Sequence, residues 1–321
     1  DAPFSNDTLH HLIHQSVRRR KSPFIPDTTN VMRLVFSEGD YIPGLIVDSY
    51  DGHLVLQCLT LGIDKMKEPI LSVLQEILNP KSIYERSDYP GRKLEGLPEM
   101  TGQCSGITPN EIVVSENEIR YPINVIEGQK TGFFIDQRDN RSLVGECAQG
   151  RKVLNMFSYS GGFTFAAIRG GARQTMSVDI SSHALSLAKK TYSLNEFTTP
   201  SEFIEADVFE YLRNEPIDAD LVILDPPAFA KRRDDVDNAC RGYKEINLQL
   251  FKKVPPGTIV LTCSCSRFIG ADLFQKVIFS AVADSGRKAQ ILRRTGHPVD
   301  HPVNIAVPET EYLKGLLLLV E

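Results

Sequence analysis

The chain begins with short apolar stretches that are separated by turn residues. Apolar and alternating runs predict strands, at residues 31–36, 45–47, 53–59 and 82–85. Apolar residues recur at helical spacing over residues 67–78, and the polar segment up to about residue 20 predicts a helix that runs into a basic end. Residues 86–110 are rich in glycine and proline, and we expect them to be irregular. This pattern predicts a small mixed α/β domain over residues 1–110.

The pattern of apolar and polar residues changes after this region. Two apolar–polar strands at 111–115 and 119–126 predict a hairpin, so we interpret residues 111–150 as a hairpin with a connecting segment. From about residue 151 strands alternate with helices: strands are predicted at 153–157, 175–178, 203–205, 221–224, 258–261, 289–292 and 316–320, and helices at 163–169, 182–195, 243–253 and 272–283. Such alternation predicts a doubly wound, mainly parallel sheet over residues 151–321. In these sheets ligands bind at the carboxyl ends of the strands.

Composition narrows the class of protein. Hydrophobic residues make up 41% of the chain and charged residues 24%, as in ordinary globular domains, and no apolar run is long enough to span a bilayer. Six scattered cysteines are too few for a disulfide scaffold, which favours a reducing, cytoplasmic setting. Neither the cysteines nor the histidines have the spacing of metal ligands, so we expect no metal. The lack of a membrane-spanning apolar run predicts no membrane partner.

The charge balance limits how the chain could bind nucleic acid. A formal net charge of −5 argues against a protein that coats nucleic acid without specificity, but it leaves room for a local basic patch. Arg18, Arg19 and Arg20 form such a cluster. It predicts contacts with an RNA backbone from the 1–110 domain, and the alternative is a solvated face.

Acidic and glycine residues gather where the predicted strands of the second domain end. The first strand leads into Asn155-Met-Phe-Ser-Tyr-Ser-Gly-Gly-Phe163, whose glycines let the backbone approach a ligand closely. Asp179, about twenty residues past this loop, has the position of an acid that binds the hydroxyls of a ribose. Asp207 follows the third strand, where it could hold an adenine amino group. One such acid alone is more often a helix cap, but together behind a glycine loop they predict a nucleoside-binding sheet.

The fourth strand ends in Asp225-Pro-Pro-Ala-Phe229. Pro226 and Pro227 stiffen the loop and fix the direction of the Asp225 carboxylate. Phe229 offers a ring that can stack on a flat base. The alternative is a rigid loop without chemistry.

Several stretches together resemble class I S-adenosylmethionine-dependent RNA methyltransferases of the RlmI-like group, which form 5-methylcytosine in 23S ribosomal RNA. They are the 155–163 loop, the 225–229 loop, Thr131-Gly-Phe-Phe-Ile-Asp-Gln-Arg-Asp-Asn-Arg141, Arg241-Gly-Tyr-Lys-Glu-Ile-Asn247 and His301-Pro302. The resemblance implies a Rossmann-like class I methyltransferase domain with a mainly parallel seven-stranded sheet. It also implies S-adenosylmethionine as the cofactor and RNA, in particular 23S ribosomal RNA, as the partner.

The resemblance also assigns roles to single residues. It implies that the cofactor is held by Asn155, Phe157, Ser158, Tyr159, Gly161, Gly162, Asp179, Asp207 and Asp225. Asp136, Gln137 and Arg138 match a stretch that packs beside the cofactor. Arg138 is interpreted either as a partner of the cofactor carboxylate or as part of a structural salt bridge. Pro226, Pro227 and Phe229 are expected on the RNA side of the site.

The fifth strand ends in Thr262-Cys-Ser-Cys-Ser266, which holds two thiols. Alternate strand residues are poorly placed to form a disulfide. C5 of cytosine is a poor nucleophile until a thiolate adds at C6, so 5-methylcytosine formation needs a cysteine at the mouth of the sheet. The resemblance aligns residues 264–266 with the motif that carries this nucleophile. Cys265 is therefore the predicted nucleophile and Asp225 its catalytic partner, whereas Cys263 is predicted to pack in the core.

The sequence departs from the group in two places. Arg267 follows the Ser-Cys-Ser motif where glycine is common, and it is expected to contact a phosphate or to narrow the pocket. The group usually begins with a small RNA-binding PUA domain, and none is recognised near the start of this chain. We expect that domain to be absent or the chain to be a fragment.

Other functions stay open at this point. A guanine-N7 or other nitrogen methyltransferase would need no thiol, so Cys265 distinguishes it from the preferred interpretation. A non-catalytic nucleoside- or RNA-binding module would not need Asp225 and Cys265 together. A nicotinamide oxidoreductase is disfavoured because the loop lacks the GxGxxG pattern. A homodimer is left open.

Overall fold

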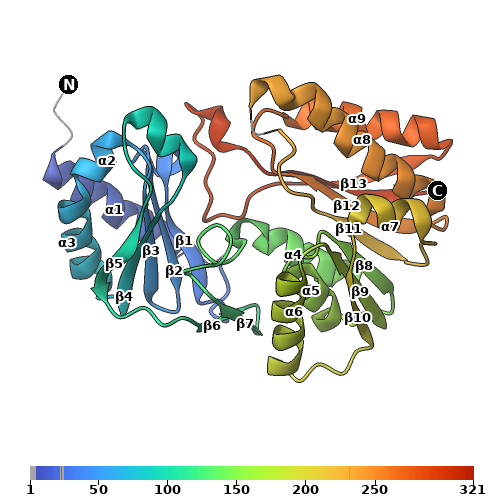
Figure 1. Ribbon diagram of the computed structural model, residues 1–321, viewed down its shortest axis with the longest axis horizontal. Coiled ribbons are helices and arrows are strands. Elements are labelled where there is room, and N and C mark those ends of the chain that lie inside the picture. Colours follow the sequence, from blue (N-terminus) through green and yellow to red (C-terminus); the bar gives the residue numbers. More distant parts are fainter. Residues whose placement is uncertain (1–4, 22, 24, 231) are drawn as a thin grey trace. The chain divides into compact units, whose positions relative to one another are not determined.

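The computed structural model describes residues 5–21, 23, 25–230 and 232–321. The chain divides into two compact units (Figure 1). Unit 1 contains the chain up to Arg138 together with Pro298–Thr310, and unit 2 contains Asp139–His297 together with Glu311–Glu321. This division falls at residues 138 and 139, whereas the sequence predicts boundaries at residues 110 and 150. None of the described helices is apolar and long enough to cross a membrane.

Unit 1 is built on a five-stranded sheet with the order β1-β2-β3-β4-β5. All neighbouring strands are antiparallel except β3 and β4, which are parallel. Its elements are α1 (Asn6–Arg20), β1 (Val31–Phe36), β2 (Leu45–Tyr50), β3 (His53–Cys58), α2 (Leu61–Lys65), α3 (Lys67–Leu78), β4 (Ser82–Ser87), β5 (Met100–Gly106) and the hairpin β6 (Ile112–Glu116) and β7 (Ile119–Ile123). The 67–78 helix and the 31–36 strand have the predicted bounds.

Helix α1 packs one face onto this sheet. Leu9, Ile13 and Val17 are buried at a spacing of four residues and join the core of the unit. The Ser5 side chain caps the helix by accepting a hydrogen bond from the Thr8 backbone N–H. Because Arg20 lies three residues beyond Val17, it falls on the same buried face.

The region predicted to be irregular contains strand β5, which pairs antiparallel with β4. Hydrophobic alternation gives no signal there, because β5 lies at the sheet edge and all of its residues are exposed or half-buried. Its order comes from backbone pairing with β4 rather than from the burial of apolar side chains. Tertiary pairing thus overrides a composition that is typical of loops.

Unit 2 contains a seven-stranded sheet with the order β10-β9-β8-β11-β12-β14-β13. The sheet is parallel except for β14, which runs antiparallel to both of its neighbours, so the predicted Rossmann-like fold is confirmed. Its elements are α4 (Arg138–Cys147), β8 (Lys152–Met156), α5 (Gly162–Arg169), β9 (Gln174–Asp179), α6 (Ser182–Leu194), β10 (Ser201–Glu205), α7 (Val208–Asn214), β11 (Leu221–Leu224), α8 (Val236–Lys253), β12 (Thr258–Ser264), α9 (Ala271–Ser285), β13 (Ala289–Thr295) and β14 (Lys314–Val320).

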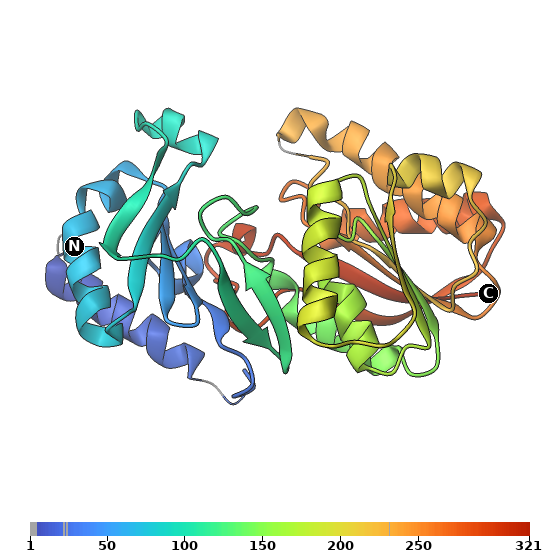
Figure 2. The same cartoon turned by 60° about the horizontal axis from the view of Figure 1, so that its bottom comes forward.

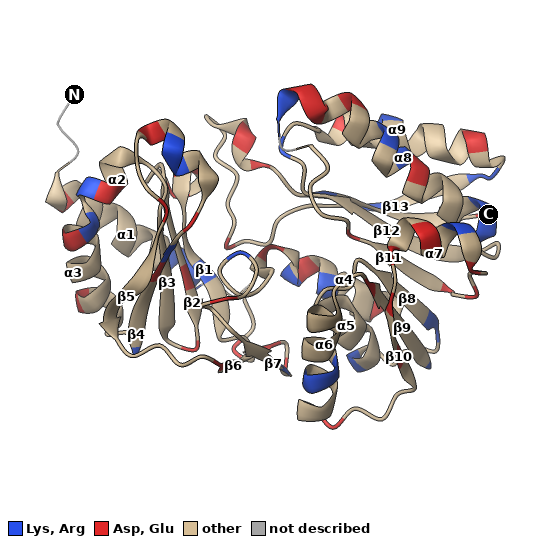
Figure 3. Ribbon diagram, in the orientation of Figure 1, with Lys and Arg blue, Asp and Glu red and all other residues tan. Residues whose placement is uncertain are grey.

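Helices cover both faces of this sheet (Figures 1 and 2). Leu221 and Ile223 of β11 join a core with residues of α4 and α5, whereas Val222 and Leu224 join a core with residues of α7, α8 and α9. Along the outer helices α8 and α9, Lys and Arg are interspersed with Asp and Glu (Figure 3). Because the side chains on both faces of each strand are covered by helices, these strands appear in the sequence as continuous apolar runs.

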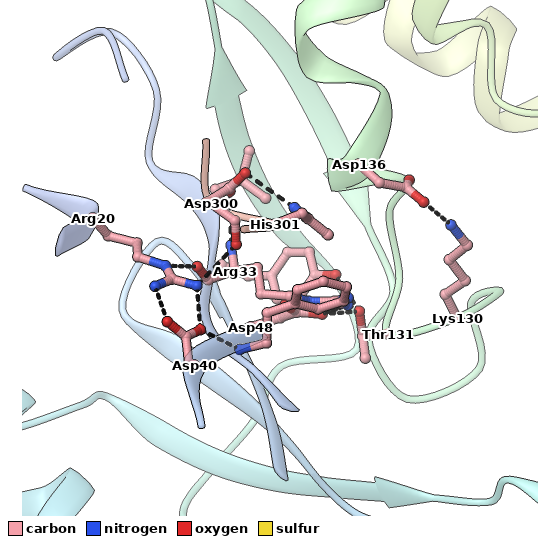
Figure 4. A network of polar contacts seen from close by, with 12 residues as sticks. Arg20, Arg33, Asp40, Asp48, Lys130, Thr131, Asp136, Asp300 and His301 are labelled. Carbon is pink, nitrogen blue, oxygen red and sulfur yellow. Dashed lines mark hydrogen bonds and ion pairs between the residues drawn. The ribbon is translucent and has the colours of Figure 1, made fainter. Parts of the chain in front are cut away.

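Residues 298–310 are held in unit 1 by a buried polar network (Figure 4). The Asp300 carboxylate accepts hydrogen bonds from Arg138 Nη2 at 2.5 Å and from the Arg33 backbone N–H at 3.0 Å. Its other oxygen lies 3.0 Å from His301 Nδ1. Arg20 donates to the Asp300 carbonyl oxygen and makes a two-fold contact with the Asp40 carboxylate. The return of this segment therefore depends on charge pairing, which hydrophobic patterning cannot predict.

Burial by itself would raise the pKa of the Asp300 carboxyl group. His301 and Arg138 beside it outweigh burial and lower that pKa well below its usual range. A lowered pKa in the folded state means that the ionised carboxylate stabilises the fold at neutral pH. This stabilisation disappears as the pH falls from the usual carboxyl range through the lowered pKa.

Replacing Asp300 should therefore destabilise unit 1. We expect Asp300→Ala to lower its free energy of unfolding by about 3–5 kcal/mol at neutral pH, because the buried Arg138 loses a charged partner. The difference from wild type should shrink below about pH 4. Hydrogen exchange of the β1 amides in increasing urea measures the effect within unit 1. Glu99→Ala, which removes an exposed pair with Lys93 in the same unit, is the control and should cost less than about 1 kcal/mol. Equal small losses in both variants would contradict the role of Asp300.

Candidate active site

The loop after β8 has an unusual backbone. Phe157 and Tyr159 both have positive φ angles, of 57° and 46°, and Gly161 has a φ of 82°. Left-handed backbone costs a non-glycine residue about 1–2 kcal/mol, so the surroundings must impose this shape. One restraint is visible, because the Tyr159 backbone N–H donates to Asp179 Oδ2 at 2.8 Å.

The two glycines of this loop lie against neighbouring helices. A Cβ atom on Gly161 would come within 2.7 Å of the Phe165 ring, and one on Gly162 within 3.0 Å of Arg141 Cδ. Any larger residue would therefore displace the loop or its neighbours. The buried Arg141 of α4 thus lies directly beside the start of α5.

Polar groups are buried under the loop. Asn155 Nδ2 donates to Thr164 Oγ1 at 3.0 Å, and Thr164 Oγ1 lies 2.7 Å from Ser177 Oγ, so these three side chains connect β8, α5 and β9. Among the residues that the structure describes, Ser158 Oγ is buried without a hydrogen-bond partner. A buried hydroxyl in that condition costs about 1–3 kcal/mol, which a bound ligand can recover.

Two predicted acids follow β9 and β10. Asp179 uses both carboxylate oxygens, one for Tyr159 N–H and the other for Ser181 N–H at 2.9 Å. Asp207 is the N-cap of α7 and accepts from the Glu210 N–H at 3.0 Å. Ile180, which the sequence analysis did not single out, is 69% exposed beside Asp179 and offers an apolar surface there.

The loops after β11 and β12 meet at the same edge of the sheet. Leu224 pairs with Thr262 across the two strands, and Cys265 Sγ lies 3.9 Å from the Pro226 carbonyl oxygen. Cys265 is half-buried. Cys263 is fully buried in the core shared with α4 and α5, so its predicted packing role is confirmed.

A set of buried contacts holds the turn that contains Cys265. Ser266 Oγ lies 2.9 Å from the Tyr243 hydroxyl and accepts from the Ala230 N–H at 3.1 Å. The Ser266 carbonyl oxygen accepts from Lys314 Nζ at 2.7 Å. The sequence analysis missed Tyr243 and Lys314 as site residues, although Tyr243 lies in the 241–247 stretch that supported the resemblance.

Burial shifts the titration of both groups. It raises the pKa of Tyr243 to about 12, so this hydroxyl stays protonated. It lowers the pKa of Lys314 to about 8, so the Lys314 amine is still protonated in most molecules at neutral pH.

The structure gives Phe229 a packing role. Its ring centroid lies 4.6 Å from that of Tyr243 and 6.1 Å from that of Phe209. Phe229 therefore positions the Asp225 loop, and the prediction that it stacks on a base has no support from its contacts. Pro226 is buried and Pro227 is exposed.

Three predicted cofactor residues, Asp136, Gln137 and Arg138, are buried within unit 1. Asp136 pairs with Lys130 at 2.6 Å, and Arg138 pairs with Asp300. Arg138 thus has the structural salt bridge that the sequence analysis considered as one of two roles. In unit 2 it is Arg141 that lies beside the glycine loop.

The basic cluster of α1 is divided by the helix geometry. Arg18 and Arg19 are exposed, whereas Arg20 is buried. Its guanidinium contacts the Asp40 carboxylate and the backbone carbonyls of Ser16, Arg33 and Asp300. The prediction that Arg20 contacts RNA is wrong, because Arg20 belongs to the polar network of unit 1.

A family model described as S-adenosylmethionine-dependent methyltransferase matches residues 100–315. The ribosomal RNA large subunit methyltransferase I of Tolumonas auensis is 44% identical over 292 residues, which cover 89% of this chain and 74% of that protein. The protein of the same name from Alteromonas mediterranea is 39% identical over 321 residues, which cover 99% and 81%. The chain belongs to the ribosomal RNA large subunit methyltransferase I family. S-adenosylmethionine is therefore its cofactor.

Solved structures share the fold. SMU.776 complexed with SAH has a TM-score of 0.87 at 24% identity, covering 99% of this chain and 82% of that one. A tRNA m1G37 methyltransferase of M. jannaschii has a TM-score of 0.57 at 18% identity, covering 92% and 77%.

The residues around the β8 loop fit the methyltransferase cofactor. Asp179 provides carboxylate acceptors for ribose hydroxyls, Ile180 an apolar surface for a flat ring, and Ser158 a buried hydroxyl in need of a partner. Bulky side chains are excluded at Gly161 and Gly162, which keeps the backbone accessible to a ligand.

Asp179 is the first residue to test. We expect Asp179→Ala to weaken the binding of S-adenosylhomocysteine by roughly 1.5–3 kcal/mol, or about ten- to a hundredfold, because hydrogen bonds to a charged group are lost and the Tyr159 restraint is released. Isothermal titration calorimetry measures the affinity. Glu205→Ala is the matched control, since Glu205 pairs with Asp179 across the strands but is exposed. An unchanged affinity in a folded Asp179 variant would remove it from the cofactor site.

Proposed function

We propose that the chain transfers a methyl group from S-adenosylmethionine to C5 of a cytosine in 23S ribosomal RNA. The observation that carries this proposal is the half-exposed thiol of Cys265, which lies against the Asp225-Pro226 loop at the edge where the parallel strands end. The names of the relatives, ribosomal RNA large subunit methyltransferase I, support the choice of RNA substrate.

The thiol supplies the activation that cytosine C5 lacks. The Cys265 thiolate adds to C6, an S–C6 bond forms, and the displaced electron pair makes C5 nucleophilic. When bound, S-adenosylmethionine supplies the methyl group for C5. A base then removes the C5 proton, and the S–C6 bond breaks to restore the ring and the thiolate.

Asp225 is proposed to orient the base. Its loop begins directly after the buried strand β11, and the two prolines that follow restrict the backbone. A carboxyl group in this place can hydrogen-bond the edge of the cytosine ring and stabilise the charge that develops on it. The ring contact between Phe229 and Tyr243 holds the end of this loop against helix α8.

The cofactor is proposed to lie over the loop after β8. Asp179 holds the ribose, Asp207 and Ile180 contact the adenine, and residues 157–162 surround the methionine part. Arg141 beside Gly162 is a candidate partner for the cofactor carboxylate, in place of Arg138.

RNA contacts are proposed in both units, each from its own exposed residues. In unit 2 the exposed Arg267 and Phe268, which is 42% exposed, directly follow the Cys265 turn and offer a charge for phosphate and a ring for stacking. In unit 1 Arg18 and Arg19 offer a basic surface on α1. The cytoplasmic location and a homodimer stay predictions.

Cys265 and Cys263 form a matched pair for testing the chemistry. With 23S ribosomal RNA transcribed with 5-fluorocytidine, the wild-type enzyme should remain covalently attached, because fluorine cannot leave as a proton does. We expect Cys265→Ala to abolish adduct and turnover while cofactor affinity is kept. Cys263→Ala should keep both, with only a loss of stability from the core.

Mass spectrometry of the trapped complex locates the adduct. An adduct on Cys263 or Cys240 would show that the nucleophile is wrongly assigned. A product methylated on a ring or exocyclic nitrogen, with no adduct, would replace the proposal by a nitrogen methyltransferase.

The basic surface of α1 is tested by salt dependence. Replacing Arg18 and Arg19 by Gln should weaken RNA binding and reduce the slope of log affinity against log salt by about 2, because two phosphate contacts are lost. Filter binding at several salt concentrations measures the slope. Replacing the exposed Lys276 and Lys288 of unit 2 by Gln removes the same charge and should leave the slope unchanged. If the α1 variant also keeps its slope, Arg18 and Arg19 belong to a solvated face.

A further inference from the structure

A buried lysine touches both residues that flank Cys265. Lys314 is the first residue of β14 and is paired with Ser264 in the antiparallel ladder with β12. Its Nζ donates to the carbonyl oxygen of Ser266 at 2.7 Å. Lys314 is 5% exposed, so its amine lies inside the protein beside the turn that carries the thiol.

A buried ammonium is costly, and its cost points to an electrostatic role. A hydrogen bond to one backbone carbonyl can be made by a neutral donor, which would avoid the desolvation of a charge. Burial also makes a charge more effective on its neighbours, because the surrounding dielectric constant is low. The lowered pKa of Lys314 reflects this burial, whereas Cys265 and Glu311 act to keep the amine protonated.

Other polar groups face the same turn from the surrounding elements. Tyr243 of α8 is neutral and bonds to Ser266, and Arg267 is exposed to solvent, which screens its charge. Asp225 and Glu311 are negative and would oppose ionisation of a nearby thiol. Among the described residues that contact the turn, Lys314 is the buried cation that can offset them.

We propose that Lys314 is a positioning residue for the nucleophile, whose buried ammonium stabilises the Cys265 thiolate while its hydrogen bond to Ser266 fixes the turn. Ionisation releases the thiol proton to solvent water, so no other group of the protein has to accept it. The proposal rests on the proposed function in taking Cys265 as the nucleophile, but thiol ionisation itself needs neither RNA nor methyl transfer.

The ionisation of Cys265 can be measured directly. The full chain is alkylated with iodoacetamide over a range of pH, and mass spectrometry follows the peptide that contains Cys265, with Cys265→Ser to assign the signal. In wild type the midpoint should lie below the ordinary thiol pKa of about 8.5. In Lys314→Gln, which keeps a hydrogen-bond donor and loses the charge, the midpoint should rise by about one unit or more. The alkylation rate near pH 7 should then fall about tenfold.

Two further variants separate charge from structure. Lys314→Arg keeps a cation and should retain most of the lowered midpoint. Lys253→Gln is the matched control, because Lys253 also donates to backbone carbonyls, those of Arg213 and Glu215, and neither lies in the Cys265 turn. It should leave the midpoint unchanged.

Several outcomes would overturn the inference. A Lys314→Gln variant that binds S-adenosylhomocysteine normally and keeps the wild-type midpoint would reduce Lys314 to a structural hydrogen bond. If that variant fails to fold, a wild-type midpoint at or above 8.5 overturns the inference without any variant. A shifted midpoint without an adduct on fluorinated RNA would contradict the proposed function alone, and an adduct with an unshifted midpoint would contradict only the role of Lys314.

Discussion

The geometry of unit 2 depends on the register of one short strand. The four residues of β11 pair in parallel with β8 on one side and with β12 on the other, so that Leu224 lies level with both Met156 and Thr262. All four are buried and alternate between the two cores. A slip of one residue would exchange the two faces, so the register is strongly specified. As a consequence, the loops that follow the three strands start at one edge of the sheet.

The end of strand β12 separates the two thiols. Cys263 still belongs to the ladder, where it faces the core of α4 and α5. Strand pairing ends at Ser264. Cys265 therefore lies outside the strand, in a turn against Pro226. The end of the ladder, rather than the chemistry of either cysteine, thus determines which thiol is accessible. Tyr243 and Ser266 fix the turn at the point where strand pairing no longer does so.

Hydrophobic patterning predicted the parts of the fold that apolar burial holds together. The bounds of β11 and α3 were correct because their apolar residues lie in buried cores. The return of residues 298–310 to unit 1 was missed because Asp300 holds it through charged partners far apart in the sequence. Arg20 was misassigned for a different reason: the charge of the cluster favours an exposed face, whereas the helical spacing of Ile13 and Val17 places Arg20 on the buried one.

Strand direction explains why Lys314 escaped prediction. In the parallel strands the residues at the site come from the carboxyl ends, so strand-end motifs are the signal that sequence analysis follows. Strand β14 runs antiparallel to β12, and its first residue, not its last, therefore reaches the same edge of the sheet. Such a residue follows a loop and precedes an apolar run. A lysine in that position of a sequence is usually interpreted as a solvent-exposed residue next to the strand. Its burial beside Ser266 becomes apparent only once the strand direction is known, because that direction brings a cation from late in the chain to the thiol.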